Sequence, residues 1–411
     1  MHISGKQIPL PVPGNYFTKH LQFAESLISS YRGGEPFHLY IKKYFSSNKK
    51  HGSKDRKQIT SLCYAYFRLG AGVTFEVTPE EKFLLGIFLC DPNSSPLLSQ
   101  LKPGWSENIN LGLNEKLKIV EDTFDVKNIF PFQRFLSDRV DYDKFAISFL
   151  QQPKLFLRIR PGKEETVLEK IRSANFYFER LNINCLVFSH NEKITSIISI
   201  DEEAVIQDYN SQRIGEFFSK YFFERQLDDG SNMSHENTVW DCCAGSGGKS
   251  ILAVDTLKNI RLTATDKRAA ILRSLEKRFA LAGIKDYETF VFDIASRDKL
   301  PFNSTFQCII ADVPCSGSGT WSRTPEQLTF FAESDIEKYA GLQKNIIKNI
   351  VPYLQIGGIL FYITCSVFKK ENEENVEYIL QNFQLNLLHE EYLKGYEMQA
   401  DTLFIAVFSK S

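Results

Sequence analysis

From residue 210 to residue 411, short apolar runs alternate with amphipathic segments of helical period. This alternation favours an α/β fold with a doubly wound parallel sheet, because parallel strands need a crossover connection, usually a helix. The expected strands are 238–240, 261–265, 289–292, 306–311 and 359–363, with a terminal antiparallel pair at 385–388 and 403–408. The expected helices are 249–257, 272–282, one that starts near Ser334 with a capping-box partner at Glu337, and 371–383. We therefore expect a Rossmann-like domain over residues 203–411.

The residues before this domain have a different character. Residues 1–145 are predicted to form an all-α domain, with helical patterns over 15–75, 80–90 and 115–124 and with Ser53 as one helix cap. Residues 146–202 are predicted to form a small α+β unit, with strands at 154–160, 185–189 and 194–200 and a helix at 164–173.

The charge of the chain is distributed unevenly. The whole sequence has a formal net charge of −1, but residues 1–73 hold 11 Lys and Arg against 3 Asp and Glu, which gives +8. A basic module beside an acidic one is typical of an enzyme that grips a polyanion through an appendage, although an ordinary solvated basic surface explains the charge equally well.

The sequence also bears on the compartment in which the chain works. No apolar run has the length of a membrane span, and the N-terminus lacks the apolar core of a secretory signal. Eight cysteines scattered through 411 residues do not form a disulfide framework. We therefore expect a cytoplasmic protein, not bound to a membrane, with reduced thiols, no metal site and a monomeric state.

Two cysteine motifs stand directly after apolar runs. Cys315 comes shortly after the apolar run 309–311, in an Asp-Val-Pro-Cys-Ser-Gly sequence, and Cys365 comes after the run 360–363, in a Thr-Cys-Ser sequence. Open α/β sheets bind their ligands at the carboxyl ends of the strands, where both thiols are expected. Two such thiols favour covalent catalysis, and the alternative is that both are small buried apolar side chains.

A glycine-rich segment and a row of aspartates predict a cofactor site. The segment after the first strand lacks the glycine that a P-loop needs at Cys243 and the Gly or Ala that a dinucleotide fingerprint needs at Ser250. An adenosine cofactor without a pyrophosphate remains, with Asp266 at two ribose hydroxyls and Asp293 at the adenine amino group. This combination indicates S-adenosylmethionine. The candidate cofactor residues are Cys243, Ala244, Gly245, Ser246, Gly247, Gly248, Lys249, Asp266, Asp293 and Asp312.

These motifs together resemble the RNA cytosine-C5 methyltransferases of the Nop/Sun type. The matching segments are 205–208 with Ser211-Gln212, 243–250, 264–267, 312–319, 323–326, 364–366 and 371–373. Residues 53–56 resemble, more weakly, part of a helical, NusB-like RNA-binding domain found in this family. The chain departs from the family pattern at Arg158-Ile159-Arg160, Gly245-Ser246 and Thr402-Leu403.

The resemblance implies a reaction and assigns roles in it. Cys365 would attack C6 of a cytosine in RNA, which activates C5 toward the methyl group, and Cys315 would assist release. The residues alone do not rank the two thiols. From its position beside Cys315, Asp312 is expected to contact cytosine N3 or N4, or the methionine end of the cofactor. Lys249, at the start of a helix, is expected to contact the cofactor carboxylate. Ribosomal RNA is the expected substrate and transfer RNA the alternative; a non-catalytic RNA-binding or ribosome-assembly factor and, more remotely, a nicotinamide dehydrogenase are the competing classes.

Overall fold

The computed structural model describes residues 14–74, 77–91, 93, 95–189, 192–223, 237–257, 259–296 and 299–411. The chain forms two compact units, one made of residues 1–131, 149–151 and 324–331, and the other of residues 132–148, 152–323 and 332–411. We call them the helical unit and the sheet unit. The boundaries at 145 and 202 that the sequence suggests remain a prediction.

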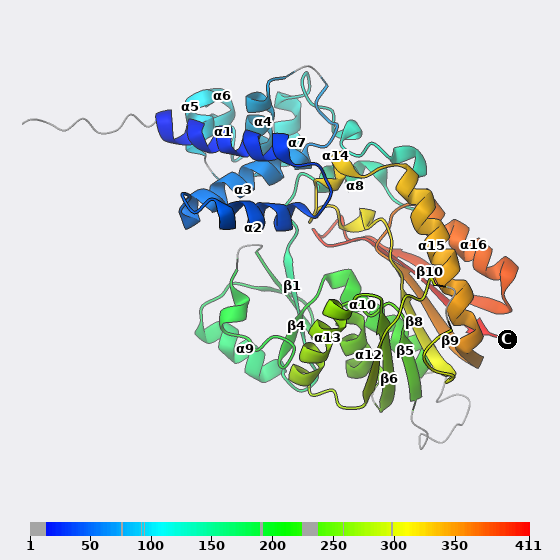
Figure 1. Ribbon diagram of the computed structural model, residues 1–411. Coiled ribbons are helices and arrows are strands. Elements are labelled where there is room, and N and C mark those ends of the chain that lie inside the picture. Colours follow the sequence, from blue (N-terminus) through cyan, green and yellow to red (C-terminus); the bar gives the residue numbers. More distant parts are fainter. Residues whose placement is uncertain are drawn as a thin grey trace, which may run out of the picture. The chain divides into compact units, whose positions relative to one another are not determined.

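The helical unit contains helices from two distant parts of the chain (Figure 1). Its helices are α1 (Gly14–Ser30), α2 (Phe37–Ser47), α3 (Ser53–Arg68), α4 (Pro79–Cys90), α5 (Pro96–Leu101), α6 (Pro103–Glu107), α7 (Leu113–Ile119) and α14 (Gln327–Phe330). The ring of Phe330 packs against those of Tyr31 and Phe67, with centroids 4.9 and 6.1 Å apart. The short segment 324–331 is thus part of the core of this unit.

Two local predictions in the helical unit are wrong. The N-cap of α3 is Gly52, not Ser53, and the Asp55 carboxylate accepts a hydrogen bond from the Gly52 N–H at 3.0 Å. The helix expected over 115–124 ends at Ile119, and Phe124 instead forms an isolated antiparallel bridge with Val73.

The sheet unit begins with a small four-stranded sheet. Its strands are β1 (Leu155–Ile159), β2 (Glu179–Asn182), β3 (Cys185–Phe188) and β4 (Ala204–Ile206), in the order β2-β3-β1-β4, with α9 (Glu164–Ser173) against them. The strand predicted at 194–200 is wrong: Ile194–Ser196 is a 3-10 helix, and Ile194 and Ile198 of this segment are buried in the core beneath the sheet. The side chains of β2 are mostly exposed, so the sequence has no apolar pattern there from which this strand could be predicted.

The larger sheet confirms the doubly wound α/β prediction. Its seven strands follow the order β10-β11-β9-β8-β5-β6-β7. They are β5 (Asn237–Asp241), β6 (Ile260–Asp266), β7 (Tyr287–Val291), β8 (Phe306–Asp312), β9 (Leu354–Thr364), β10 (Leu385–Leu393) and β11 (Leu403–Lys410). Strands β5 to β9 pair in parallel, and β10 and β11 close the sheet as an antiparallel pair.

Helices cover both faces of this sheet (Figure 1). On one face, α10 (Tyr209–Phe218), α12 (Gly248–Leu257) and α13 (Ala269–Leu281) share a core with Val239, Ile310 and Phe361 of the strands. On the other face, Tyr362 reaches Gln343 of α15 (Ser334–Ile350) and Asn375 of α16 (Glu373–Asn382). The capping box expected at Ser334 is absent, since Ser334 is the first helical residue and the N-cap is Glu333.

The strand order places a switch point inside this sheet. From β5 the chain proceeds to β6 on one side, and later returns to β8 on the other side of β5. In open α/β sheets a ligand crevice lies outside the carboxyl ends of the strands at such a point. Among the described residues, no helix is both long and apolar enough to span a bilayer.

Candidate active site

A pocket of about 560 Å³ lies at the carboxyl ends of β5, β6, β8 and β9, within the sheet unit. Both candidate catalytic cysteines line it, and so do nine of the ten candidate cofactor residues: Cys243, Ala244, Gly245, Ser246, Gly248, Lys249, Asp266, Asp293 and Asp312. The structure therefore brings into one cavity residues that are up to 122 positions apart, from Cys243 to Cys365.

The two cysteines are neighbours in space. The sulfurs of Cys315 and Cys365 are 3.2 Å apart, and the Cys365 N–H donates to the Cys315 sulfur at 3.3 Å. Because the Cys315 thiol lies against the other sulfur and is withdrawn from water, its pKa is raised well above the usual value. Cys315 therefore keeps its proton, and it is placed to share that proton with the sulfur of Cys365.

A partly buried ion pair lies beside the cysteines. The Lys249 ammonium, on the first turn of α12, is 2.6 Å from the Asp312 carboxylate at the end of β8. Burial alone would lower the pKa of Lys249, but Asp312 and, to a smaller extent, Cys365 raise it above its usual value. The lysine is therefore a stable cation near Cys365.

Asp241, at the end of β5, is the most deeply buried of the aspartates in this region. One of its oxygens accepts from the Ser250 hydroxyl at 2.6 Å, while the other has no hydrogen-bond partner. Burial, together with the nearby Asp312, raises the pKa of Asp241 to about 7. Asp241 does not line the pocket but lies behind the glycine loop.

Asp266 ends β6 as predicted, and both of its oxygens are engaged. Oδ2 accepts from the Gly245 N–H at 3.1 Å and from Arg268 Nη2 at 2.9 Å, and Oδ1 accepts from the Arg268 N–H and Nε. Burial alone would raise the pKa of Asp266, but these hydrogen bonds lower it. Asp266 thus stays ionised, and the exposed Arg268 side chain covers the oxygens that were expected to meet a ribose.

Gly247 is the candidate cofactor residue that does not line the pocket. Its φ is +84°, and an added Cβ would lie 2.9 Å from the Phe279 ring and 3.0 Å from Leu275. Its role in this structure is to let the loop turn tightly over α13. The loop is also held by Arg278, which donates to the carbonyl oxygen of Ser246 at 2.9 Å.

Several pocket residues were not assigned to the site from the sequence. Arg268, Arg278, Phe292, Ile294, Leu342 and Ile346 line the cavity, together with Ile206, Gln207 and Cys242. Leu342 and Ile346 belong to the apolar stripe of α15, which by pattern alone indicates a helix core. Gln207 belongs to a motif quoted for the family resemblance, and its amide bridges Arg158 and the carbonyl of Gly248 at 2.8 and 3.4 Å. That motif was the one signal available for it.

The chain departs from the family pattern at Arg158–Arg160, and the structure shows what these arginines contact. Both arginines bind the carboxylate of Asp255 on α12, at 2.6 and 2.7 Å. They therefore join the small sheet to the larger one.

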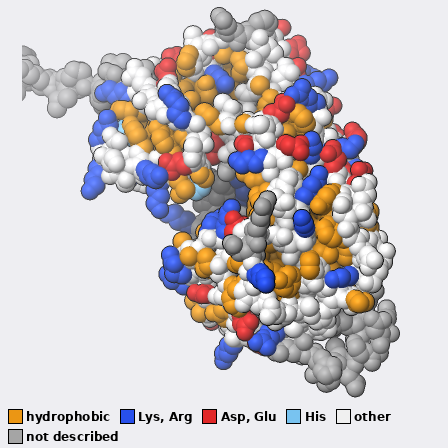
Figure 2. Space-filling model, turned by 45° about the vertical axis from the view of Figure 1, so that its right-hand side comes forward, with side chains coloured by type: hydrophobic (Ala, Val, Ile, Leu, Met, Phe, Trp, Pro, Cys, Tyr) orange, Lys and Arg blue, Asp and Glu red, His pale blue; other side chains and the backbone are white. Residues whose placement is uncertain are grey.

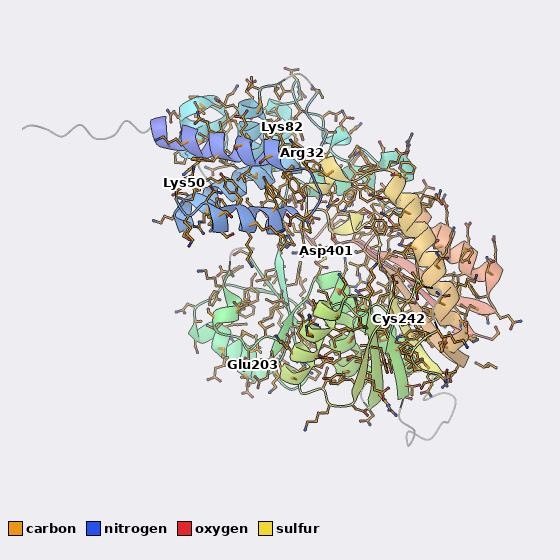
Figure 3. All side chains as sticks on the ribbon, viewed as in Figure 1. Arg32, Lys50, Lys82, Glu203, Cys242 and Asp401 are labelled. Atoms are coloured by element: carbon orange, nitrogen blue, oxygen red, sulfur yellow. The ribbon has the colours of Figure 1, made fainter. Side chains whose placement is uncertain are left out.

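Figure 3 labels Cys242, at the start of the glycine loop, and Asp401, which accepts a hydrogen bond from Arg323 at 2.8 Å.

The fold and the pocket together define a Rossmann-like α/β domain with a ligand pocket at the carboxyl ends of its strands. Residues 231–403 match the family model described as 16S rRNA methyltransferase RsmB/F.

Two curated relatives illustrate the range of the similarity. The ribosomal RNA small subunit methyltransferase B of Shewanella oneidensis is 32% identical over 142 residues, which are 34% of this chain and 33% of that protein. The tRNA (cytosine(72)-C(5))-methyltransferase NSUN6 of Mus musculus is 30% identical over 157 residues, which are 35% of this chain and 32% of that protein. The chain thus spans about a third of the length of these relatives.

Solved structures share the fold at low sequence identity. The crystal structure of PH0851 has a TM-score of 0.67 and 17% identity, and covers 98% of this chain and 100% of that one. NSun6 from Pyrococcus horikoshii with SFG has a TM-score of 0.55 and 16% identity, and covers 69% of this chain and 96% of that one. At these identities the likeness concerns the fold alone.

Proposed function

We propose that this protein transfers a methyl group from S-adenosylmethionine to C5 of a cytosine in RNA, through a covalent bond between Cys365 and C6. The observation that carries the proposal is the 3.2 Å separation of the Cys315 and Cys365 sulfurs at the wall of the pocket. A core packing role would not need two thiols at the edge of a cavity, next to a partly buried ammonium.

The residues of the site supply the parts of covalent catalysis. The Cys365 thiolate, stabilised by the nearby Lys249 ammonium and by a hydrogen bond from the Cys315 thiol, adds to C6. Addition places electron density on C5, which can then attack a methyl group. For release, the C5 proton leaves to water, its electron pair re-forms the C5–C6 double bond, and the electrons of the C6–S bond return to the sulfur of Cys365. The Cys315 thiol hydrogen-bonds to that departing sulfur.

The residues around the glycine loop fit an adenosine cofactor. Gly245 has a φ of +53° and no atom within 4 Å of an added Cβ, so its backbone is open to a ligand. The ionised Asp266 matches a pair of ribose hydroxyls once the exposed Arg268 side chain turns away, and Phe292 and Ile294 offer apolar contact to a flat base. S-adenosylmethionine, when bound there, supplies an electrophilic methyl group. The structural neighbour with SFG, an analogue of S-adenosylmethionine, supports this choice.

The Lys249–Asp312 pair can serve the base or the cofactor. Asp312 could accept from the cytosine amino group, and Lys249 could bind the carboxylate of the cofactor together with the free N–H groups at the start of α12. Both side chains line the same cavity as Cys365, so each assignment is compatible with the proposed reaction.

RNA is the proposed partner, and the target base must be unpaired or extruded to reach a half-buried thiol. Ribosomal RNA is the first candidate substrate, because the matching family model is named for 16S rRNA. Transfer RNA is the second, because the mouse relative acts on a tRNA cytosine by its name. Figure 2 shows several Lys and Arg side chains on the part of the surface that the helical unit contributes, where phosphate contacts are expected.

Two single variants test the reaction. Cys365→Ala should abolish methyl transfer and leave no covalent complex with RNA. Cys315→Ala should instead trap a protein–RNA adduct that survives denaturing electrophoresis. An adduct formed by Cys365→Ala would reverse the two roles, and wild-type protein that binds RNA but transfers no methyl group would favour a non-catalytic binding factor.

A further inference from the structure

The two cysteine loops are joined by one buried carboxylate. Glu371, in the short 3-10 helix Lys369–Glu371 after β9, is fully buried. One of its oxygens accepts from the N–H of Ser316 at 2.9 Å, and the other accepts from the hydroxyl of Ser366 at 2.6 Å. Ser316 directly follows Cys315, and Ser366 directly follows Cys365. The Glu371 side chain therefore binds the residue that comes after each cysteine in the chain.

Hydrogen bonds from and between neighbouring side chains fix the position of this carboxylate. Gln343 on α15 donates to Glu371 at 2.9 Å and to the carbonyl of Pro314 at 3.0 Å. The orientation of this amide is set by Asn375, which donates to the Gln343 carbonyl oxygen at 2.7 Å. Tyr362 of β9 donates to the Glu371 carbonyl at 2.6 Å. Glu371 therefore has little freedom to move.

The serines complete the link between the loops. The Ser366 hydroxyl lies 3.1 Å from that of Ser316 and 3.2 Å from that of Ser318, and Ser318 accepts from the Val367 N–H at 2.9 Å. In addition, the Gly319 N–H donates to the carbonyl of Cys365 at 2.8 Å. Only Glu371 among these groups is a carboxylate, and removing it would leave buried N–H donors without an acceptor, which is costly.

We propose that Glu371 is a positioning residue that holds Cys315 against Cys365, so that Cys315 can stabilise the departing thiolate when the methylated base is released. The proposal rests on the proposed function, because it takes Cys365 as the nucleophile. Glu371 binds the residue after each cysteine, through the backbone N–H of Ser316 and through the side-chain hydroxyl of Ser366. Because small misplacements of reacting groups cost large rate factors, losing this bridge should slow release by roughly 10-fold to 100-fold.

The test compares four variants for adduct accumulation on RNA, product release and thermal midpoint. Glu371→Ala should accumulate the covalent adduct even though Cys315 is present, with cofactor affinity unchanged. Glu371→Gln should restore most of the release, because its carbonyl oxygen can accept from Ser316 and Gln343 while its amide donates to Ser366. Glu203→Ala is the matched control, since Glu203 is a buried carboxylate in the small sheet that accepts from Lys170 and the Ser199 N–H (Figure 3). It should lower the thermal midpoint without trapping RNA.

Cys315→Ala is the reference that separates the two proposals. If Cys315→Ala traps the adduct and Glu371→Ala does not, the positioning role is wrong and the proposed function stands. If Cys315→Ala traps nothing, the assignment of the cysteines is wrong, and the positioning role falls with it. Should Glu371→Ala not fold, Ser366→Ala carries the test, because it removes one arm of the bridge; trapped RNA supports the role, and its absence overturns it.

Discussion

At the scale of single residues, three aspartates at neighbouring strand ends are held in three different states by their surroundings. Asp241 is buried against a serine hydroxyl, Asp312 forms an ion pair with Lys249, and Asp266 accepts hydrogen bonds from Arg268 and from a loop N–H. The same residue type at the same edge therefore gives a titrating group, a partner for a cation and a permanent anion.

Asp266→Ala should weaken binding of S-adenosylmethionine about 10-fold to 100-fold, since a hydrogen bond to a charged group contributes about 1.5–3 kcal/mol. Isothermal titration calorimetry on the purified protein measures this directly. Glu288→Ala is the matched control, because Glu288 is an exposed carboxylate on β7 whose ion pair with Arg261, at 3.0 Å, lies in solvent. Unchanged affinity in Asp266→Ala would remove Asp266 from the ribose site.

Asp241 predicts a specific dependence of stability on pH. Its pKa of about 7 in the folded protein lies above the usual value of 3.8, so the folded state binds the extra proton between these values. The stabilisation is complete below pH 3.8 and is lost as the pH rises through 7. Asp241→Asn should therefore flatten the fall in thermal midpoint between pH 5 and pH 8, measured by differential scanning fluorimetry. A variant with the same fall as the wild type would contradict the assignment of this titration to Asp241.

At the scale of elements, the glycine loop depends on backbone geometry that side-chain patterns do not encode. Gly247→Ala should destabilise the protein by about 1–3 kcal/mol and lower cofactor affinity, because its positive φ disfavours a Cβ and the new methyl group would meet Phe279 and Leu275. Chemical denaturation measures the loss. Gly341→Ala, in the middle of α15 with no atom within 4 Å of an added Cβ, should be neutral or slightly stabilising. Equal losses in both would show that Gly247 carries no special strain.

The sequence predicted those elements whose apolar periodicity is strong. The strands and helices of the larger sheet were found because buried parallel strands are nearly continuous apolar runs, as in 309–311 and 360–363. The prediction failed where local physics competes, as at 194–200, whose isoleucines pack into a core from a 3-10 turn. The predicted helix caps failed because an adjacent residue occupied the cap position.

The residues of the candidate site could be predicted from the sequence only where they follow a strand of strong apolar pattern. An apolar strand can be predicted from the sequence, and its prediction indicates which residues lie at its carboxyl end. Cys315, Cys365, Asp266 and Asp312 were found in this way. Glu371 and Gln343 come from a turn and from the inner face of α15, and their convergence exists only in three dimensions. Arg268 was missed because its contact with Asp266 depends on a side-chain conformation rather than on spacing.

At the scale of the whole molecule, one chain is divided between two units of different charge. Residues 1–73 carry +8, and residues 1–13 of this segment lie outside the described residues. In the described part, exposed lysines follow one another from α2 into α3, and Figure 3 labels Lys50 in the connection between these helices. The segment 324–331, which directly follows Arg323 of the sheet unit, belongs to the helical unit. RNA held by the helical unit would thus be bound by the same chain that carries the two proposed catalytic cysteines.

The triple variant Lys49→Gln, Lys54→Gln, Lys57→Gln should weaken binding to RNA and flatten its salt dependence, because each lost phosphate contact lowers the slope of log K against log salt by about 0.7–0.9. Filter binding or fluorescence anisotropy between 50 and 200 mM salt, roughly the range over which such contacts are screened, gives both quantities. Methyl transfer at saturating RNA should stay near the wild-type rate, since the three lysines lie in the helical unit, and the two proposed catalytic cysteines lie in the sheet unit. The control removes the same charge elsewhere, with Lys118→Gln, Lys285→Gln and Lys348→Gln. If the control variant loses as much affinity and slope as the test variant, the basic segment is an ordinary solvated surface, and the RNA is held by other residues.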